Sequence, residues 1–147
     1  MHSRLLLADD VAGIARVHRR ACLIAYKFMN WSYAEDEVRD WYAGIFASWD
    51  WGLVAETETA LVGFVATSGA HLDQLFVDPD YQKRGIGTSL LTAALSRTPA
   101  PVTLHVFEAN TPARRFYESH GFHEAGAFFN ETEHALELVY RRDENSN

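Results

Sequence analysis

The chain has 147 residues, of which 48% are apolar, and it carries a formal net charge of −7. This length and composition predict one folded domain over residues 1–147 with a hydrophobic core, and they exclude a disordered chain. No apolar run approaches the ~20 residues of a membrane span, and an acidic chain is not expected to bind nucleic acid.

The single cysteine and the N-terminus indicate a cytoplasmic protein. Cys22 has no partner for an internal disulfide, which fits a reducing cytoplasm, and it falls among apolar residues that predict helix packing. The apolar stretch at residues 5–7 is too short for a signal peptide. The acidic balance fits a cationic substrate such as an amine, although solubility alone would also explain it.

The first third of the chain predicts a strand and two helices. Residues 4–8 suit a strand, and Asp9 or Asp10 can cap the helix that follows. Ser32 and Glu35 have the spacing of a capping box for a second helix that ends near residue 46. Helical spacing predicts the buried faces Ile14, Val17, Ala21 and Ile24 or Ala25 in the first helix, and Trp41, Ile45 and Val38 in the second.

The middle of the chain predicts a hairpin, a buried strand and a glycine loop. Residues 51–56 and 60–68 suit two antiparallel strands, and residues 72–77 are an apolar run that suits a further strand. Asp78-Pro79 ends that run, because proline cannot donate to a ladder. Residues 82–87, Gln-Lys-Arg-Gly-Ile-Gly, then open a helix with apolar residues at helical spacing.

This glycine loop has the features of an anion site. The first turn of a helix has free N–H groups, and the helix dipole adds positive potential there. Gly85 and Gly87 carry no Cβ to keep a phosphate away, and Lys83 and Arg84 add charge. A diphosphate would fit. A tight turn without a ligand is the alternative, because the dinucleotide and P-loop fingerprints are both absent.

The last third predicts a strand, a helix and a hairpin. Residues 102–107 suit a strand, and Thr111 with Pro112 can start a helix that ends at Gly121. Residues 122–129 and 134–140 suit a final hairpin around the turn at 130–133. Residues 141–147 are polar, and we expect them to be a frayed tail.

Two segments resemble signatures of the GNAT superfamily of N-acetyltransferases. Residues 82–87 match Gln-x-x-Gly-x-Gly, which in that family follows a strand and precedes an amphipathic helix. Residues 110–122 match the family's Asn-x-x-Ala-x-x-Phe-Tyr-x-x-x-Gly-Phe. Both segments occur in the family's order, with a predicted strand between them.

The resemblance implies a fold over nearly the whole chain. The expected class is α/β (α+β), in the order β-α-α-β-β-β-α-β-α-β-β, with a mixed, mostly antiparallel sheet of seven strands flanked by four helices. It also implies that the fourth and fifth strands run parallel and splay apart. The pantetheine arm of acetyl-CoA would lie in that gap and pair with the fourth strand.

The resemblance also implies acetyl-CoA as co-substrate. No metal is expected, because the histidines lack metal-ligand spacing. Leu75 would polarise the thioester carbonyl through its backbone N–H, and Asn110 would bond the cofactor or serve as a cap. The expected cofactor contacts are Leu75, Phe76, Val77, Gln82, Lys83, Arg84, Gly85, Ile86, Gly87, Thr88, Asn110, Ala113, Phe116 and Tyr117.

Acetyl transfer to an amine needs an acid and a base. The resemblance places Tyr117 near the cofactor sulfur, where a phenol with a pKa near ~10 can protonate the leaving thiolate. Packing as a core aromatic is the alternative role. For the base, His71 and Asp73 stand near the start of the fourth strand and share one face with Leu75 and Val77; a surface position at the strand end is their alternative role. Glu56 is a third candidate.

The predicted function is direct acetyl transfer to a primary amine of a small molecule or a peptide. In the family the acceptor wall lies between the first two helices, and the candidates there are Phe28, Met29, Trp31 and Tyr33. Phe128 and Phe129 can close this wall from the last hairpin, and core packing is the alternative role for all six. A non-catalytic module that binds acyl-CoA is the rival function, and a longer acyl chain is a further option. The sequence leaves a homodimer open and predicts no membrane partner.

Overall fold

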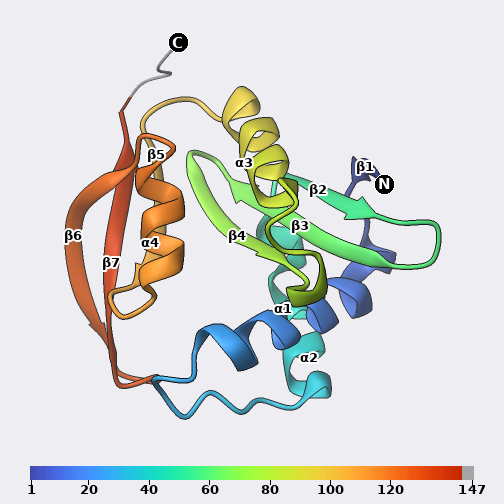
Figure 1. The fold of residues 1–147 in the computed structure, drawn as a ribbon, viewed down its shortest axis with the longest axis horizontal. Coiled ribbons are helices and arrows are strands. Elements are labelled where there is room, and N and C mark those ends of the chain that lie inside the picture. The colour runs from blue at the N-terminus through green and yellow to red at the C-terminus, as the bar shows by residue number, and fades with distance from the viewer. Residues whose placement is uncertain (144–147) are drawn as a thin grey trace.

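The computed structural model describes residues 1–143, which form a seven-stranded mixed sheet and four α-helices (Figure 1). The strands lie in the order β1-β2-β3-β4-β5-β7-β6, and within the described residues only β4 and β5 pair in parallel. The elements are β1 His2–Leu5, α1 Val11–Ala25, α2 Glu35–Ile45, β2 Trp51–Glu56, β3 Leu61–Ser68, β4 His71–Val77, α3 Ile86–Arg97, β5 Val102–Phe107, α4 Thr111–Glu118, β6 His123–Asn130 and β7 Ala135–Arg142. The predicted class and order are confirmed.

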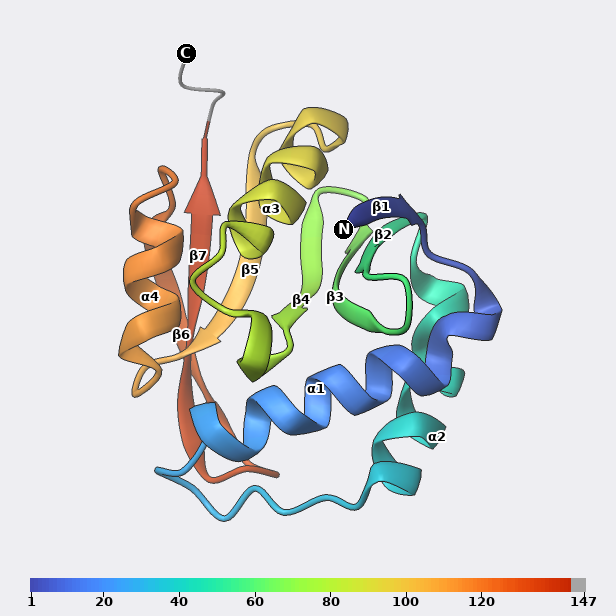
Figure 2. The same ribbon diagram turned by 45° about the vertical axis from the view of Figure 1, so that its right-hand side comes forward.

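The sheet divides where β4 and β5 part. Their parallel ladder is a single residue pair, His71 with Thr103, supported by a 3.0 Å bond from the Thr103 N–H to the Ala70 carbonyl. Beyond that pair the two strands diverge, as Figures 1 and 2 show. Within residues 1–143, the rest of the β4 edge that faces β5 therefore has no strand partner, as the resemblance implied.

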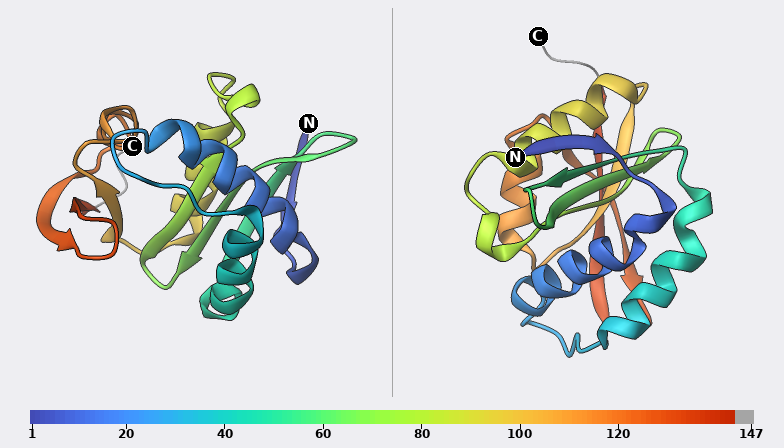
Figure 3. Two further views of the ribbon diagram at one scale, coloured as in Figure 1. Left: turned by 90° about the horizontal axis from the view of Figure 1, so that it is seen from below. Right: turned by 90° about the vertical axis from the view of Figure 1, so that its right-hand side faces the viewer.

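Helices cover both faces of the sheet. One core cluster joins α3 and α4 to the sheet through buried side chains such as Leu90, Leu104 and Tyr140. A second cluster joins α1 and α2 to the opposite face through Ile14, Tyr42 and Phe64. Figure 3 shows α1 and α2 together on one side of the strands. Both clusters follow from apolar residues at helical spacing that meet alternating apolar residues of the strands.

The predicted buried faces of the two N-terminal helices are wrong at a few positions. Helix α2 starts at Glu35, and the Glu37 carboxylate accepts the Ala34 N–H at 2.9 Å, so Ser32 is not the cap. This start turns Val38 and Tyr42 inward and leaves Trp41 48% exposed, so the predicted face is wrong at Trp41. In α1 the residues Ile14, Val17, Ala21 and Cys22 are buried as predicted, whereas Ile24 and Ala25 are exposed.

The glycine loop ends at the start of α3. Gly85, with φ +83°, precedes the first helical residue, and the apolar residues Ile86, Leu90, Leu91 and Ala94 of the helix are buried. Asp78 ends β4 and is buried, and its carboxylate accepts bonds from Arg20 at 3.0 Å and from the Asp80 N–H at 2.9 Å. Helix α1 is thereby tied to the turn that leads into the loop.

Three further boundaries correct the prediction. Strand β1 ends at Leu5, because the Asp10 carboxylate accepts the Leu7 N–H at 2.8 Å and starts a turn. The cap of α4 is Asn110, whose side chain accepts the Ala113 N–H, and not Thr111. Arg141 and Arg142 belong to β7, so the expected frayed tail is wrong at these two positions, and residues 144–147 lie outside the described part.

No helix within residues 1–143 combines the length and apolarity that a membrane crossing requires.

Candidate active site

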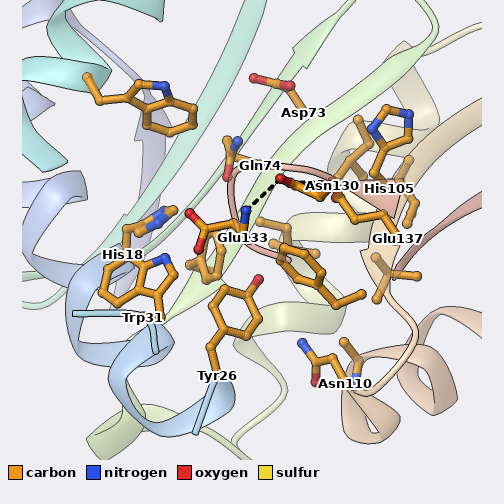
Figure 4. A pocket seen from close by; sticks show the side chains of 18 of the residues that line it. His18, Tyr26, Trp31, Asp73, Gln74, His105, Asn110, Asn130, Glu133 and Glu137 are labelled. Carbon is orange, nitrogen blue, oxygen red and sulfur yellow. Dashed lines mark hydrogen bonds between the residues drawn. The ribbon is translucent and has the colours of Figure 1, made fainter. Parts of the chain in front are cut away.

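A cavity of about 650 Å³ opens where β4 and β5 part. Its walls come from β4, β5, α1, α2, α4, the segment between α1 and α2, and the β6–β7 hairpin (Figure 4). Segments distant in sequence thus meet around the edge of β4 that lacks a strand partner. The predicted residues that line the cavity are Trp31, Tyr33, His71, Asp73, Leu75, Phe76, Asn110, Ala113 and Tyr117.

A β-bulge in β4 shapes this wall. Gln74 pairs with Ala66 and Leu72 with Thr67, so Asp73 is the extra residue. Leu75 and Val77 pack with the α3 cluster, whereas the Asp73 carboxylate accepts the Trp49 indole N–H at 2.8 Å among residues of the α1–α2 cluster. The prediction that His71, Asp73, Leu75 and Val77 share one face is therefore wrong, because the bulge breaks the alternation.

Tyr117 on α4 is buried and lies in the wall of the cavity. Its ring packs against Phe116 and Phe122, with ring centroids 5.3 and 5.6 Å away. The hydroxyl has no hydrogen-bond partner within residues 1–143, and burial raises the pKa of Tyr117. The phenol therefore stays protonated at neutral pH and faces the cavity as an unused donor.

Two of the three candidate bases, His71 and Asp73, line the cavity. His71 Nδ1 is 2.9 Å from the Thr103 hydroxyl, and the His71 and His105 rings are 4.9 Å apart. Burial, with His105 as a second cause, lowers the pKa of His71, while the Asp73 carboxylate opposes that change. Glu56 is bonded to Arg4 at 3.0 Å and lies outside the cavity lining, so the structure does not bring it to this site.

The glycine loop lies beside the cavity and not in its lining. Gln82 Nε2 donates to the Val77 carbonyl at 3.0 Å, and a Cβ on Gly87 would meet the Phe116 ring at 3.6 Å. A Cβ on Gly85 would meet no atom within 4 Å, so that side of the loop is open. The predicted contacts outside the cavity lining are Val77, Gln82, Lys83, Arg84, Gly85, Ile86, Gly87, Thr88 and Phe116.

Only some of the residues predicted for the acceptor wall line the cavity. Trp31 and Tyr33 line it, whereas Phe28 and Phe129 do not, and Phe129 is 52% exposed. The Tyr33 hydroxyl donates to the Glu133 carboxylate at 2.6 Å and joins the α1–α2 segment to the β6–β7 turn. Figures 1 and 2 both show these two segments meeting.

Several cavity residues were missed by the sequence prediction, among them His18, Tyr26, Gln74 and Glu133. His18 lies on the buried face of α1, one residue after Val17. A polar side chain on an otherwise apolar helix face is the sequence feature that could have identified it as a site residue. Glu133 lay in a turn that was assigned only to a hairpin. Figure 4 shows its carboxylate directed into the cavity near His18 and Trp31.

The charged side chains that line the cavity are acidic. Four carboxylates, those of Glu37, Asp73, Glu133 and Glu137, line the cavity within the described chain, and no lysine or arginine does. Glu137 accepts a bond from the Asn130 amide at 2.9 Å, and the Asn130 side chain also accepts the Glu133 N–H at 2.9 Å. A cavity with this lining favours cations over anions. Within residues 1–143, no cluster of three or more His, Cys, Asp or Glu could hold a metal ion.

The parted strands, the glycine loop at a helix N-terminus and the phenol beside them are the architecture of an acetyltransferase of the GNAT type. A family model described as "Acetyltransferase (GNAT) family" matches residues 17–122. The chain belongs to the GNAT acetyltransferase family.

Named relatives agree with this assignment. The chain is 45% identical over 65 residues to the peptidyl-lysine N-acetyltransferase YjaB of Salmonella typhimurium, which covers 44% of each chain. It is 38% identical over 87 residues to the peptidyl-lysine N-acetyltransferase YiaC of Escherichia coli, which covers 58% of this chain and 56% of YiaC. The matches thus span about half the length of these relatives.

A solved structure covers more of the chain. The apo form of YjaB from Escherichia coli matches with a TM-score of 0.78 and 27% identity, and the match covers 95% of both chains.

Proposed function

We propose that this chain transfers an acetyl group from acetyl-CoA directly to a primary amine. The observation that carries the proposal is the Tyr117 hydroxyl, an unpaired donor on the wall of a cavity that opens where β4 and β5 part. A binding module would need the cavity and the loop, but it has no use for an acid in that position.

The donor site would extend from the glycine loop to the cavity. The open side of Gly85 and the N–H groups of the first turn of α3 suit the cofactor's diphosphate. The unpaired edge of β4 suits an extended pantetheine arm, which would bond to it as an added strand. Leu75 lines the cavity, and its backbone N–H is our candidate for the group that polarises the thioester carbonyl.

The cavity residues can serve each step of the transfer. The amine nitrogen bonds to the thioester carbon, and its proton passes to His71 or, through water, to Asp73. The carbon–sulfur bond then breaks, and Tyr117 gives its proton to the thiolate. Cys22 is fully buried, and burial raises the pKa of its thiol well above the ordinary value, so a covalent acyl-cysteine step has no support.

The acceptor is best matched by a cationic amine such as a lysine side chain. The carboxylate lining of the cavity would attract an ammonium ion, and the Trp31 and Tyr33 rings can cover its alkyl chain. The relatives named peptidyl-lysine N-acetyltransferases make a protein lysine the first candidate, with a small polyamine second.

An amine panel with acetyl-CoA tests this function. Lysine peptides, polyamines, amino acids and a neutral aniline should be compared by thiol release, with mass spectrometry of each product. We expect acetylated products from the cationic amines and none from the aniline. Acetyl-CoA binding without any acetylated product would instead favour the acyl-CoA-binding module.

A further inference from the structure

His18 is a buried imidazole that the proposed reaction does not yet use. It lies on α1, is 9% exposed and forms part of the cavity wall. Aromatic rings surround it, with the centroid of Phe76 at 4.5 Å, Trp31 at 5.8 Å and Trp41 at 6.0 Å. Because this polar ring is buried at a substrate cavity, each of its two nitrogen atoms is expected to have a hydrogen-bond partner.

One nitrogen belongs to a buried chain of hydrogen bonds. His18 Nδ1 is bonded to the Tyr42 hydroxyl, and that hydroxyl donates to Gln74 Oε1 on β4 at 3.4 Å. A hydroxyl has one proton, and when Gln74 receives it, Nδ1 is the donor to Tyr42, which is the tautomer that we assign to His18. In a neutral imidazole the proton on Nδ1 leaves Nε2 as an acceptor.

The other nitrogen faces the cavity. His18 Nε2 has no hydrogen-bond partner within residues 1–143, and no fully buried side-chain nitrogen or oxygen in this part of the chain lacks one. Nε2 is therefore accessible, and the accessible space beside it is the cavity, as Figure 4 shows. Burial lowers the pKa of His18 to about 4, so the ring is neutral and Nε2 keeps its lone pair at neutral pH.

We propose that His18 Nε2 accepts a hydrogen bond from the acceptor amine and orients the nitrogen for attack. This role rests on the acetyl transfer proposed above and names a contact residue for it. No proton passes to His18, because an imidazole that resists protonation is a poor base. A neutral acceptor also does not repel the ammonium ion that Glu133 and the other carboxylates attract.

Two substitutions separate the two nitrogen atoms. His18→Asn places an amide near Nδ1, which can still donate to Tyr42, and removes Nε2. His18→Gln reaches the position of Nε2 and can accept there. With Nα-acetyl-lysine methylamide as the probe, we expect His18→Asn to lower kcat/KM for the amine about fivefold to tenfold, the scale of one lost hydrogen bond. His18→Gln should recover most of that loss, and KM for acetyl-CoA should stay within about twofold in both.

His123→Asn is the matched control, since His123 is exposed on β6 and outside the cavity lining. An unchanged kcat/KM in His18→Asn, equal to that of His123→Asn, would overturn the proposal. So would an equal rise in KM for acetyl-CoA and for the amine, because that pattern indicates general damage to the cavity.

The tautomer provides a test that does not depend on activity. Long-range ¹H–¹⁵N spectra of histidine-labelled protein bound to coenzyme A should show His18 as the Nδ1–H tautomer at pH 7. Addition of the lysine probe should shift the Nε2 resonance. An Nε2–H tautomer, or no shift at saturating probe, would overturn the assignment of His18. A wild-type chain that binds the probe but acetylates no amine would instead overturn the proposed function.

Discussion

Substitution of Tyr117 by phenylalanine separates catalysis from packing. The ring is 9% exposed and its contacts are with Phe116 and Phe122, which phenylalanine would keep. The hydroxyl has no hydrogen-bond partner within residues 1–143, so its removal breaks no bond of the fold. We therefore expect the free energy of unfolding, measured in urea, to change by less than about 1 kcal/mol.

The effect of Tyr117→Phe on turnover should be much larger. Loss of a general acid typically lowers kcat by about 10²-fold, which is about 2.7 kcal/mol of barrier. Thiol release at saturating acetyl-CoA and amine measures kcat, and calorimetry measures cofactor affinity, which should stay within about twofold. Full activity in a stable Tyr117→Phe protein would refute the role of the phenol. A loss of activity that parallels a loss of stability would leave Tyr117 as a core residue.

Three further predictions concern the loop, the acceptor side and the buried imidazole. Gly85→Asn should lower coenzyme A affinity by more than about tenfold in calorimetry. Gly69→Asn, at another left-handed position with open space, should not lower it. Equal affinities in the two variants would show that the loop is only a turn. Glu133→Gln should raise KM for a cationic amine about fivefold, the scale of one charged contact. Glu131→Gln on the same turn should not raise it. Equal KM values in the two variants would contradict the contact between Glu133 and the cation. The pKa of His18 is about 4 in the folded chain and 6.5 in the unfolded chain, so the folded state binds fewer protons than the unfolded state, and the free energy of unfolding should fall as the pH drops below 6.5. In urea titrations, the free energy of unfolding of the wild-type chain should fall by about 2 kcal/mol more between pH 7 and pH 5 than that of His18→Asn. The same pH dependence in both proteins would contradict the burial of a neutral ring.

Much of the fold was predictable because its signals are local. The apolar run of β4, the proline after it and the glycines before α3 each define a boundary within a few residues. The boundaries that were wrong depend on contacts between residues distant in the sequence. The wrong burial in α2 depends on the residue at which the helix starts. Trp41 and Tyr42 are neighbours in the chain, and only the start of α2 at Glu35 decides which of them is buried.

The site was less predictable, because it is assembled from segments that meet only after folding. The motif residues Asn110, Ala113 and Tyr117 were found through the family resemblance and do line the cavity. The bulge at Asp73 could not be predicted, because it depends on the register with β3. Glu133 reaches the cavity only through the pairing of β6 with β7 and its contact with Tyr33, which no spacing in the sequence encodes.

Transfer of a labelled acetyl group tests the central claim most directly. Protein, [¹³C-acetyl]-coenzyme A and a lysine peptide should be incubated and the products followed by mass spectrometry and thiol release together. The account predicts one labelled acetyl-lysine for each coenzyme A released, with no label on the protein at Cys22. Both products should form about 10²-fold more slowly in Tyr117→Phe. Release of coenzyme A without labelled peptide, or a labelled acyl-enzyme that precedes it, would contradict direct transfer to an amine.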